Sequence, residues 1–318
     1  MNMAAVKPED EKKWDQIRRL LDDENPTVRG ALISELKNFP EEGVHFLEKV
    51  IREPDHFLAK HAHSLLVELG WVDGVGGFLQ FIRSLRYELE SGWFLLDRTV
   101  FPTLDISSST LFLDRMADRT RELLIPPQNA RDICSVINRV LFHEFEFRAA
   151  SKDFSDPQNS FLHRVLERRR GLPITLSVVY LLVARRIGFE LEPIGLPGRF
   201  MVGCFSEKKP FYIDAWSGGK FFEIEHMEKF LGDSSIVNTG SFLLPVTVAE
   251  TLTRGCRNLV QQFAQSGEVE NSGLFQKFVN EFERVHQREA NACASFINRR
   301  FISPASESSG IGSFRSTD

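Results

Sequence analysis

The strongest potential nucleophiles of this 318-residue sequence are four cysteines that stand far apart in the chain: Cys134, Cys204, Cys256 and Cys293. No pair has CxxC or CxxH spacing, so the usual zinc-ligand patterns are missing, and the sequence predicts no metal site and no cofactor. His61 and His63 are two residues apart on a predicted helix, point about 200° apart, and cannot share a metal. We expect reduced, mostly buried thiols, because the chain begins without an apolar signal segment.

A catalytic thiol is usually activated at the start of a helix, beside a histidine that a carboxylate or amide orients. The stretch RRGLPITLSVVYLLVARRIG, residues 169–188, has the form of such a helix, with Pro173 at its first position and Gly188 after its end. No cysteine stands at its start. The hydroxyls of Thr175 and Ser177 are expected to cap the helix or bond to a carbonyl rather than to react.

Residues 174–184 are almost all apolar and cover the whole circumference of this predicted helix, which is typical of a buried helix. Three short strands are predicted after it, over residues 189–196, 199–205 and 210–216, separated by PG and SEKK turns. A buried helix backed by a meander of strands indicates an α+β arrangement.

The order of these elements resembles the transglutaminase-like, papain-related plan, in which a cysteine begins a helix and a histidine and an aspartate follow on two strands. The segments NSFLHRVLERRRGLPITLSVVYLLVARRIG, GLPGRF and YIDAWSGG are similar to the SirB-type transglutaminase-like family of bacteria. That domain also occurs in a eukaryotic F-box protein. The resemblance covers roughly residues 90 to 255.

The resemblance implies where the catalytic triad of the family would fall. The helix-ending glycine of the family commonly lies about four helical turns after the cysteine, and counting back from Gly188 by that distance reaches Pro173. The family's histidine, in PGHF, corresponds to Arg199 in PGRF, and its aspartate to Asp214 in YIDAW. Pro173 supplies no nucleophile, and an arginine cannot act as a base at neutral pH. We therefore expect a vestigial triad in which Arg199 and Asp214 form a bidentate ion pair.

Two other roles stay open for this region. Arg199 could remain partly available beside the helix start and bind a carboxylate or phosphate, and a cleft of this kind would then include Arg170, Ile174, Thr175, Arg199, Asp214 and Trp216. Cys204 is the fallback nucleophile. It lies five residues after Arg199 on the same predicted strand, and this odd separation points it to the opposite face.

Helices are predicted on both sides of this core. Residues 14–70 have the pattern of two helical hairpins offset by about 31 residues, which resembles HEAT repeats, and a plain helical bundle is the alternative. The glycine-rich stretch 71–77 predicts a break, followed by further helix over 92–124 and by a helix over 130–147 that carries Cys134 on its apolar face.

Further elements follow from capping and composition. Asn159 or Ser160 is expected to cap the helix FLHRVLERRR. Residues 246–302 are predicted to form two helices, and the Ser/Gly-rich tail 303–318 is expected to be disordered. The sequence thus predicts a predominantly helical α+β fold with four parts: HEAT-like helical hairpins over 1–75, a transglutaminase-like core over 76–245, a C-terminal helical hairpin over 246–302, and the tail 303–318.

Composition narrows the class of partner. A net charge of −5 offers no electrostatic attraction to nucleic acid or to an anionic membrane. The sequence contains no uncharged run long enough to cross a bilayer as a helix, so we expect no membrane span and a cytoplasmic location.

The sequence favours a catalytically inactive transglutaminase-like protein that acts as a protein-binding or regulatory module with one or more protein partners. The alternatives are a papain-related hydrolase or acyltransferase with a rearranged nucleophile, and a purely structural scaffold.

Overall fold

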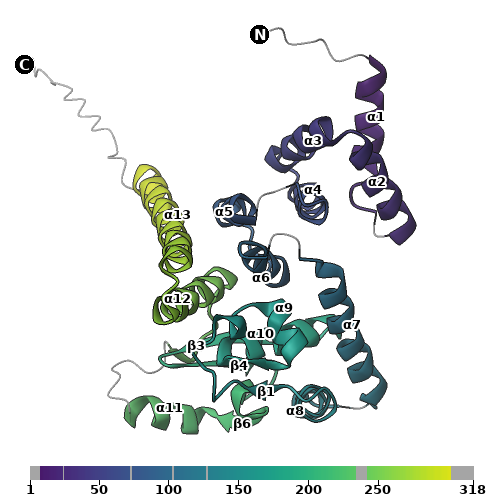
Figure 1. The fold of residues 1–318 in the computed structure, drawn as a ribbon. Coiled ribbons are helices and arrows are strands. Elements are labelled where there is room, and N and C mark those ends of the chain that lie inside the picture. The colour runs from purple at the N-terminus through teal and green to yellow at the C-terminus, as the bar shows by residue number, and fades with distance from the viewer. Residues whose placement is uncertain are drawn as a thin grey trace, which may run out of the picture.

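The computed structural model describes residues 8–23, 25–71, 74–101, 104–126, 128–233 and 242–301. Helices dominate these residues, and the strands form one four-stranded and one two-stranded sheet (Figure 1). The predicted predominantly helical α+β fold is confirmed. The expected disordered tail lies outside the described residues.

The N-terminal part consists of helices with an apolar core of their own, as residues 14–70 predicted: α1 (Pro8–Arg19), α2 (Pro26–Asn38), α3 (Pro40–Arg52) and α4 (His56–Glu68). Asn25 and Asp55 cap α2 and α4 by accepting hydrogen bonds from amides of the first turn, which local sequence accounts for. Leu36 and Leu47 are completely buried where these helices meet. Figure 1 shows them at one end of the molecule, with α5 and α6 between them and the sheet.

The predicted glycine-rich break is only partly correct, because helix α5 (Gly74–Ser84) already begins at Gly74. A methyl group at Gly74 would lie 2.0 Å from the carbonyl oxygen of Arg98, at the end of α6 (Leu89–Arg98). The glycine therefore allows two helix ends to approach closely instead of interrupting a helix. The helix expected over 92–124 is also two helices, α6 and α7 (Ile106–Leu123).

Helix α8 (Ala130–Asn138) continues as a π-helical turn, η1 (Arg139–Glu144), so the helix predicted over 130–147 is present with an altered second half. Cys134 faces the apolar core, as predicted. Its backbone carbonyl accepts a hydrogen bond of 3.0 Å from the hydroxyl of Tyr180, which fixes α8 against the central helix.

The central helix α10 (Pro173–Arg186) has the predicted bounds, with proline at its first turn. Every residue from 174 to 184 is buried, which confirms that this helix forms the centre of the core. Gly188 follows its end with a φ of +77°, the left-handed conformation that a glycine provides at a helix terminus.

The four-stranded antiparallel sheet has the order β3-β4-β5-β6, with β3 (Glu192–Leu196), β4 (Arg199–Cys204), β5 (Phe211–Asp214) and β6 (Lys220–Glu223). The first three strands lie within the predicted ranges, and β6 was not predicted. Alternate residues of β4 enter different cores. Phe200, Val202 and Cys204 join the core around α10, and Met201 packs on the other face with Met227 of α11 (Ile224–Asp233). The sheet thus lies between α10 and α11 (Figure 1).

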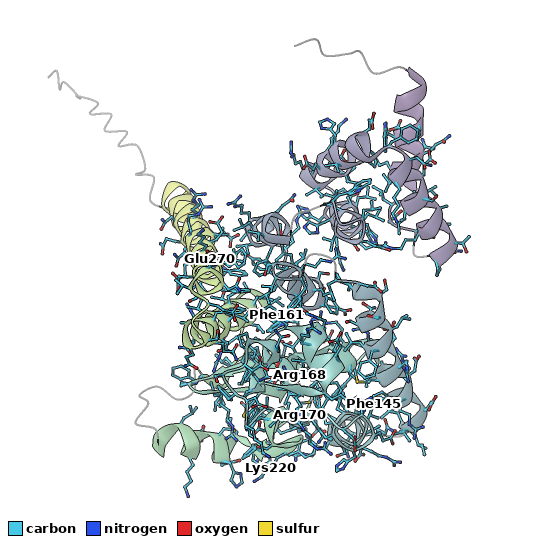
Figure 2. All side chains as sticks on the ribbon, viewed as in Figure 1. Phe145, Phe161, Arg168, Arg170, Lys220 and Glu270 are labelled. Carbon is cyan, nitrogen blue, oxygen red and sulfur yellow. The ribbon has the colours of Figure 1, made fainter. Side chains whose placement is uncertain are left out.

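A short pair of strands and a helical hairpin complete the core. Strands β1 (Arg148–Ala149) and β2 (Arg170–Gly171) form a short parallel pair just before α10, with the 3-10 turn η2 (Pro157–Asn159) and helix α9 (Leu162–Arg168) between them. The C-terminal hairpin predicted over 246–302 is present as α12 (Val248–Ser266) and α13 (Val269–Phe301). Phe263 of α12 stacks on Phe275 of α13 with ring centroids 5.6 Å apart. Phe161, which Figure 2 labels, packs against both rings.

Candidate functional site

The start of α10 is closed by its own side chains rather than open to a ligand. The amide of Leu172 donates a hydrogen bond of 2.9 Å to Thr175 Oγ1, and this hydroxyl donates one of 2.9 Å to the carbonyl oxygen of Asn159. Thr175 has no exposed surface, and Ile174 is also buried. The capping role expected for Thr175 is confirmed, and a hydroxyl held in this way is not presented to a substrate.

Arg199 and Asp214 form an ion pair, as predicted, whereas the bidentate form expected for it stays a prediction. The Arg199 Nη2 atom lies 2.7 Å from Asp214 Oδ2, and the Asp214 side chain has no exposed surface. Two further donors reach the same carboxylate. The hydroxyl of Ser217 donates to Oδ2 at 2.7 Å, and the amide of Trp216 donates to Oδ1 at 3.1 Å. Charge-assisted hydrogen bonds of this kind hold the turn η3 (Ala215–Ser217) at the end of β5.

The guanidinium of Arg199 lies on the side of the sheet that α11 covers. Its central carbon is 5.6 Å from the ring centroid of Phe222, and Phe222 packs on the cluster that contains Met227. Lys220, which Figure 2 labels, is the first residue of β6, and its Nζ atom lies 5.1 Å from the centroid of the same ring. The structure therefore joins Arg199 to Asp214 and the aromatic residue, and gives little support to an anion site shared with the buried Ile174 and Thr175.

The other two candidate cleft residues lie at the surface of neighbouring elements. Trp216 is half-buried and makes an edge contact with the exposed Phe154, with ring centroids 5.7 Å apart. Arg170, which Figure 2 labels, is exposed and lies in β2, where its backbone pairs with that of Arg148 in β1.

The cysteine thiols of the described side chains are enclosed. Cys204 has no exposed surface and faces α10, opposite to Arg199, as its odd spacing predicted. Burial, with the neighbouring Cys204, raises the pKa of the Cys134 thiol to about 12, and burial also raises the pKa of Cys256. A thiolate nucleophile needs the opposite change, a lowered pKa at an accessible position.

Two cavities of the described structure lie away from Arg199 and Asp214. The first, of about 310 Å³, lies between the loop before η2 and the end of α12, and the second, of about 380 Å³, lies between α5 and α13. Their lining residues include none of the candidate cleft residues. The first is lined by Lys152, Asp153, Ser155, Asp156, Pro157, Gln265 and Ser266, and the second by Arg83, Leu85, Arg284, Val285, Arg288 and Glu289.

Sequence reasoning missed a buried pair between Asp97 of α6 and His163 of α9. Asp97 Oδ2 lies 2.8 Å from His163 Nδ1 and accepts the His163 amide at 2.7 Å, and Oδ1 accepts the Leu162 amide at 2.9 Å. Asp97 therefore caps α9 from another helix, and the expected cap by Asn159 or Ser160 was wrong. Ser160 instead donates to Gln262 of α12 at 2.6 Å, because this loop is held between α6 and α12. Asp97 lies more than 60 residues before the start of α9, so the sequence around that helix start does not reveal its capping residue.

The histidines of α4 have structural surroundings. The ring of His61 makes an edge contact with Phe57 at 4.7 Å, and the buried Nε2 atom of His63 has no hydrogen-bond partner in the part of the chain that the structure describes. Within the same ranges, no three His, Cys, Asp or Glu side chains gather as a metal site would require. None of the described helices combines the length and apolar character needed to cross a membrane.

His63 predicts an acid sensitivity of the N-terminal helices. Burial lowers the pKa of His63 below its ordinary value of 6.5, so the unfolded chain binds more protons near that pH. The contribution of neutral His63 is present above pH of about 6.5 and is lost as the pH falls toward the folded-state pKa. We expect the urea midpoint to fall between pH 7.5 and pH 5.5 by less in His63→Leu than in the parent. His56→Gln, at an exposed histidine of the same helix, is the matched control.

Residues 109–257 match the sequence model of a family described as the transglutaminase-like superfamily, so this part of the chain is a transglutaminase-like domain. F-box only protein 21 of Mus musculus is 31% identical over 143 residues, which is 42% of this chain and 22% of that protein.

A UPF0162 protein of Xylella fastidiosa is 30% identical over 139 residues, 42% of this chain and 48% of that protein. A UPF0162 protein of Vibrio cholerae is 24% identical over 132 residues, 41% of this chain and 49% of that protein. The chain spans less than half the length of each of these curated relatives. No solved structure matches the chain.

Proposed function

We propose that the chain is a SirB-type transglutaminase-like protein whose triad is vestigial, and that it acts as a protein-binding or regulatory module. The single observation that carries this proposal is the ion pair between Arg199 and the fully buried Asp214. An arginine at the position of the general base, already committed to a carboxylate, cannot accept a proton from a nucleophile. The HEAT-like interpretation of residues 1–75 and the C-terminal hairpin belong to the same proposal, as surfaces for partners.

Other features of the site also support a catalytically inactive protein. Pro173 occupies the first turn of α10, where the family's cysteine would stand, and Thr175 is held by two hydrogen bonds. The alternative of a hydrolase or acyltransferase would need Cys204 to attack from the face of the sheet opposite to Arg199, with no surface exposed to substrate. We therefore favour the binding module.

Thiol reactivity tests the enzymatic alternative. We expect Cys134, Cys204 and Cys256 to react with iodoacetamide at pH 8 at least about tenfold more slowly in the folded protein than in guanidinium, because each thiol is buried. Mass spectrometry of the peptides identifies each labelled position separately. Labelling of Cys204 in the folded protein at the rate of a free cysteine, or an acyl-transfer activity that Cys204→Ala abolishes, would contradict the proposal.

Partner capture tests the binding role. Wild-type protein, Arg199→Met and Arg52→Gln are used as baits in parallel, after circular dichroism has shown that all three are folded. Arg52 is an exposed residue of α3, so its substitution removes the same charge far from β4. A partner held by the wild type and Arg52→Gln and lost by Arg199→Met would support a recognition site at the vestigial triad. A partner that all three baits retain would place binding on the helical parts instead.

A further inference from the structure

The cavity of about 380 Å³ between α5 and α13 has an unusual lining, with three arginines around two apolar residues. Arg83 comes from the last turn of α5, and Arg284 and Arg288 lie one turn apart on α13. Leu85 and Val285 provide the apolar part. The two helices are far apart in sequence and meet only in the folded chain, and neither of them carries Arg199 or Asp214.

One largely buried carboxylate holds two of the arginines in place. Glu281 Oε1 lies 2.6 Å from Arg83 Nε, and Oε2 lies 2.8 Å from Arg284 Nε. Hydrogen bonds from Arg284 and Arg83 lower the pKa of Glu281 to about 2, and its side chain is only 12% exposed. Each guanidinium keeps further N–H groups beyond these contacts, and its side chain is about half exposed. The two arginines are thus oriented before any ligand arrives, which lowers the entropy lost on binding.

Arg288 adds a third cation to the lining. Among the residues that the structure describes, it forms no ion pair, although it lines the cavity with Arg284. Glu289 is the acidic residue of the lining. The negative charges of Glu281 and Glu289 offset two of the three arginines, so the net charge at the cavity is +1.

Leu85 carries backbone strain at the same place. Its φ is +58°, in the left-handed region that leucine rarely adopts, and its side chain is 38% exposed. An exposed apolar residue held in a disfavoured conformation is stable only because its surroundings fix it, and such residues are concentrated at binding sites. Leu85 therefore presents an apolar surface to a cavity that three arginines also line.

We propose that this cavity is a docking site for an acidic peptide segment of a protein partner, with carboxylates on Arg284 and Arg288 and an apolar side chain against Leu85 and Val285. Guanidinium groups bind carboxylates through paired hydrogen bonds. Leu85 and Val285 would favour a peptide in which an apolar residue stands next to the acidic ones. The half-exposed arginines leave the cavity too open to enclose a small molecule, which favours a chain segment that continues over the surface.

The test uses the full chain and a fluorescein-labelled octapeptide of seven glutamates and one central leucine, followed by fluorescence anisotropy. We expect Arg288→Gln to weaken binding about fivefold, since it removes one charge-assisted contact. Arg52→Gln, the matched loss of one distant positive charge, should change the dissociation constant by less than about twofold. Serine in place of leucine in the peptide should weaken binding about fivefold through lost apolar burial.

Four results would overturn the assignment. These are no binding at about 1 mM peptide, equal weakening by Arg288→Gln and Arg52→Gln, equal binding of the leucine and serine peptides, or complete displacement by inorganic phosphate at constant ionic strength. The second and third would indicate a diffuse attraction of polyanions, and the fourth a phosphate site. Because Arg288 lies on an exposed helix face, loss of the fold is not expected, and circular dichroism of the variant checks it.

Discussion

Gly74→Ala is expected to destabilise the protein by about 3 kcal/mol, because the new methyl group would overlap the backbone of another helix. Its Cβ would lie 2.0 Å from the carbonyl oxygen of Arg98 and 3.0 Å from the amide nitrogen of Thr99. Neither atom can rotate away as a side chain could. The first turn of α5 would have to move from the end of α6, and Phe78 and Trp93, both completely buried, would lose their packing.

Gly273→Ala is the matched control for this substitution. Gly273 lies within α13, and a Cβ there would meet no atom within 4 Å. Alanine in a helix interior is about 0.5–1 kcal/mol more stable than glycine, so this variant should gain stability. Urea denaturation followed by circular dichroism gives both changes in the free energy of unfolding. If Gly74→Ala were as stable as the parent, the close approach of α5 to α6 would be refuted.

Those parts of the fold that depend on local pattern were predictable from the sequence. The bounds of α10 follow from Pro173, the apolar run and Gly188, all within one short stretch. Strands β3 to β5 follow from alternation and turn residues, and the ion pair of Arg199 with Asp214 follows from the resemblance to a family of known plan. In each case the residues that decide the structure are neighbours in sequence or correspond to a motif.

Features that depend on contacts between distant segments were missed or misjudged. The glycine-rich pattern around Gly74 predicts a break because glycine disfavours helix, but the role of Gly74 is set by its contact with Arg98, which local pattern does not reveal. The face of the sheet on which Arg199 lies depends on where α11 packs. The arginine-lined cavity forms only where α5 and α13 meet, and the sequence of either helix alone does not indicate a binding site.

Asp97→Asn should be the second strongly destabilising substitution, with an expected loss of about 3 kcal/mol. The carboxylate has no exposed surface and accepts three hydrogen bonds, from the amides of Leu162 and His163 and from the His163 ring. Asparagine has the same shape but only one acceptor oxygen. Its NH2 group would face at least one of these N–H donors, so a buried amide at the start of α9 would lose its partner.

Asp105→Asn separates this effect from the loss of any helix-capping carboxylate. Asp105 caps α7 by accepting the Ser107 amide at 3.0 Å, and it is exposed. Asparagine is as good as aspartate at such a position, so the free energy of unfolding should change by less than about 0.5 kcal/mol. Urea denaturation of both variants at neutral pH measures the difference. A loss in Asp97→Asn no larger than in Asp105→Asn would mean that the buried pair does not fix α9, and with it the loop that leads into α10. A large loss confined to Asp97→Asn would establish that the frame around the start of α10 is held by a residue of α6, outside every motif that the family resemblance contains.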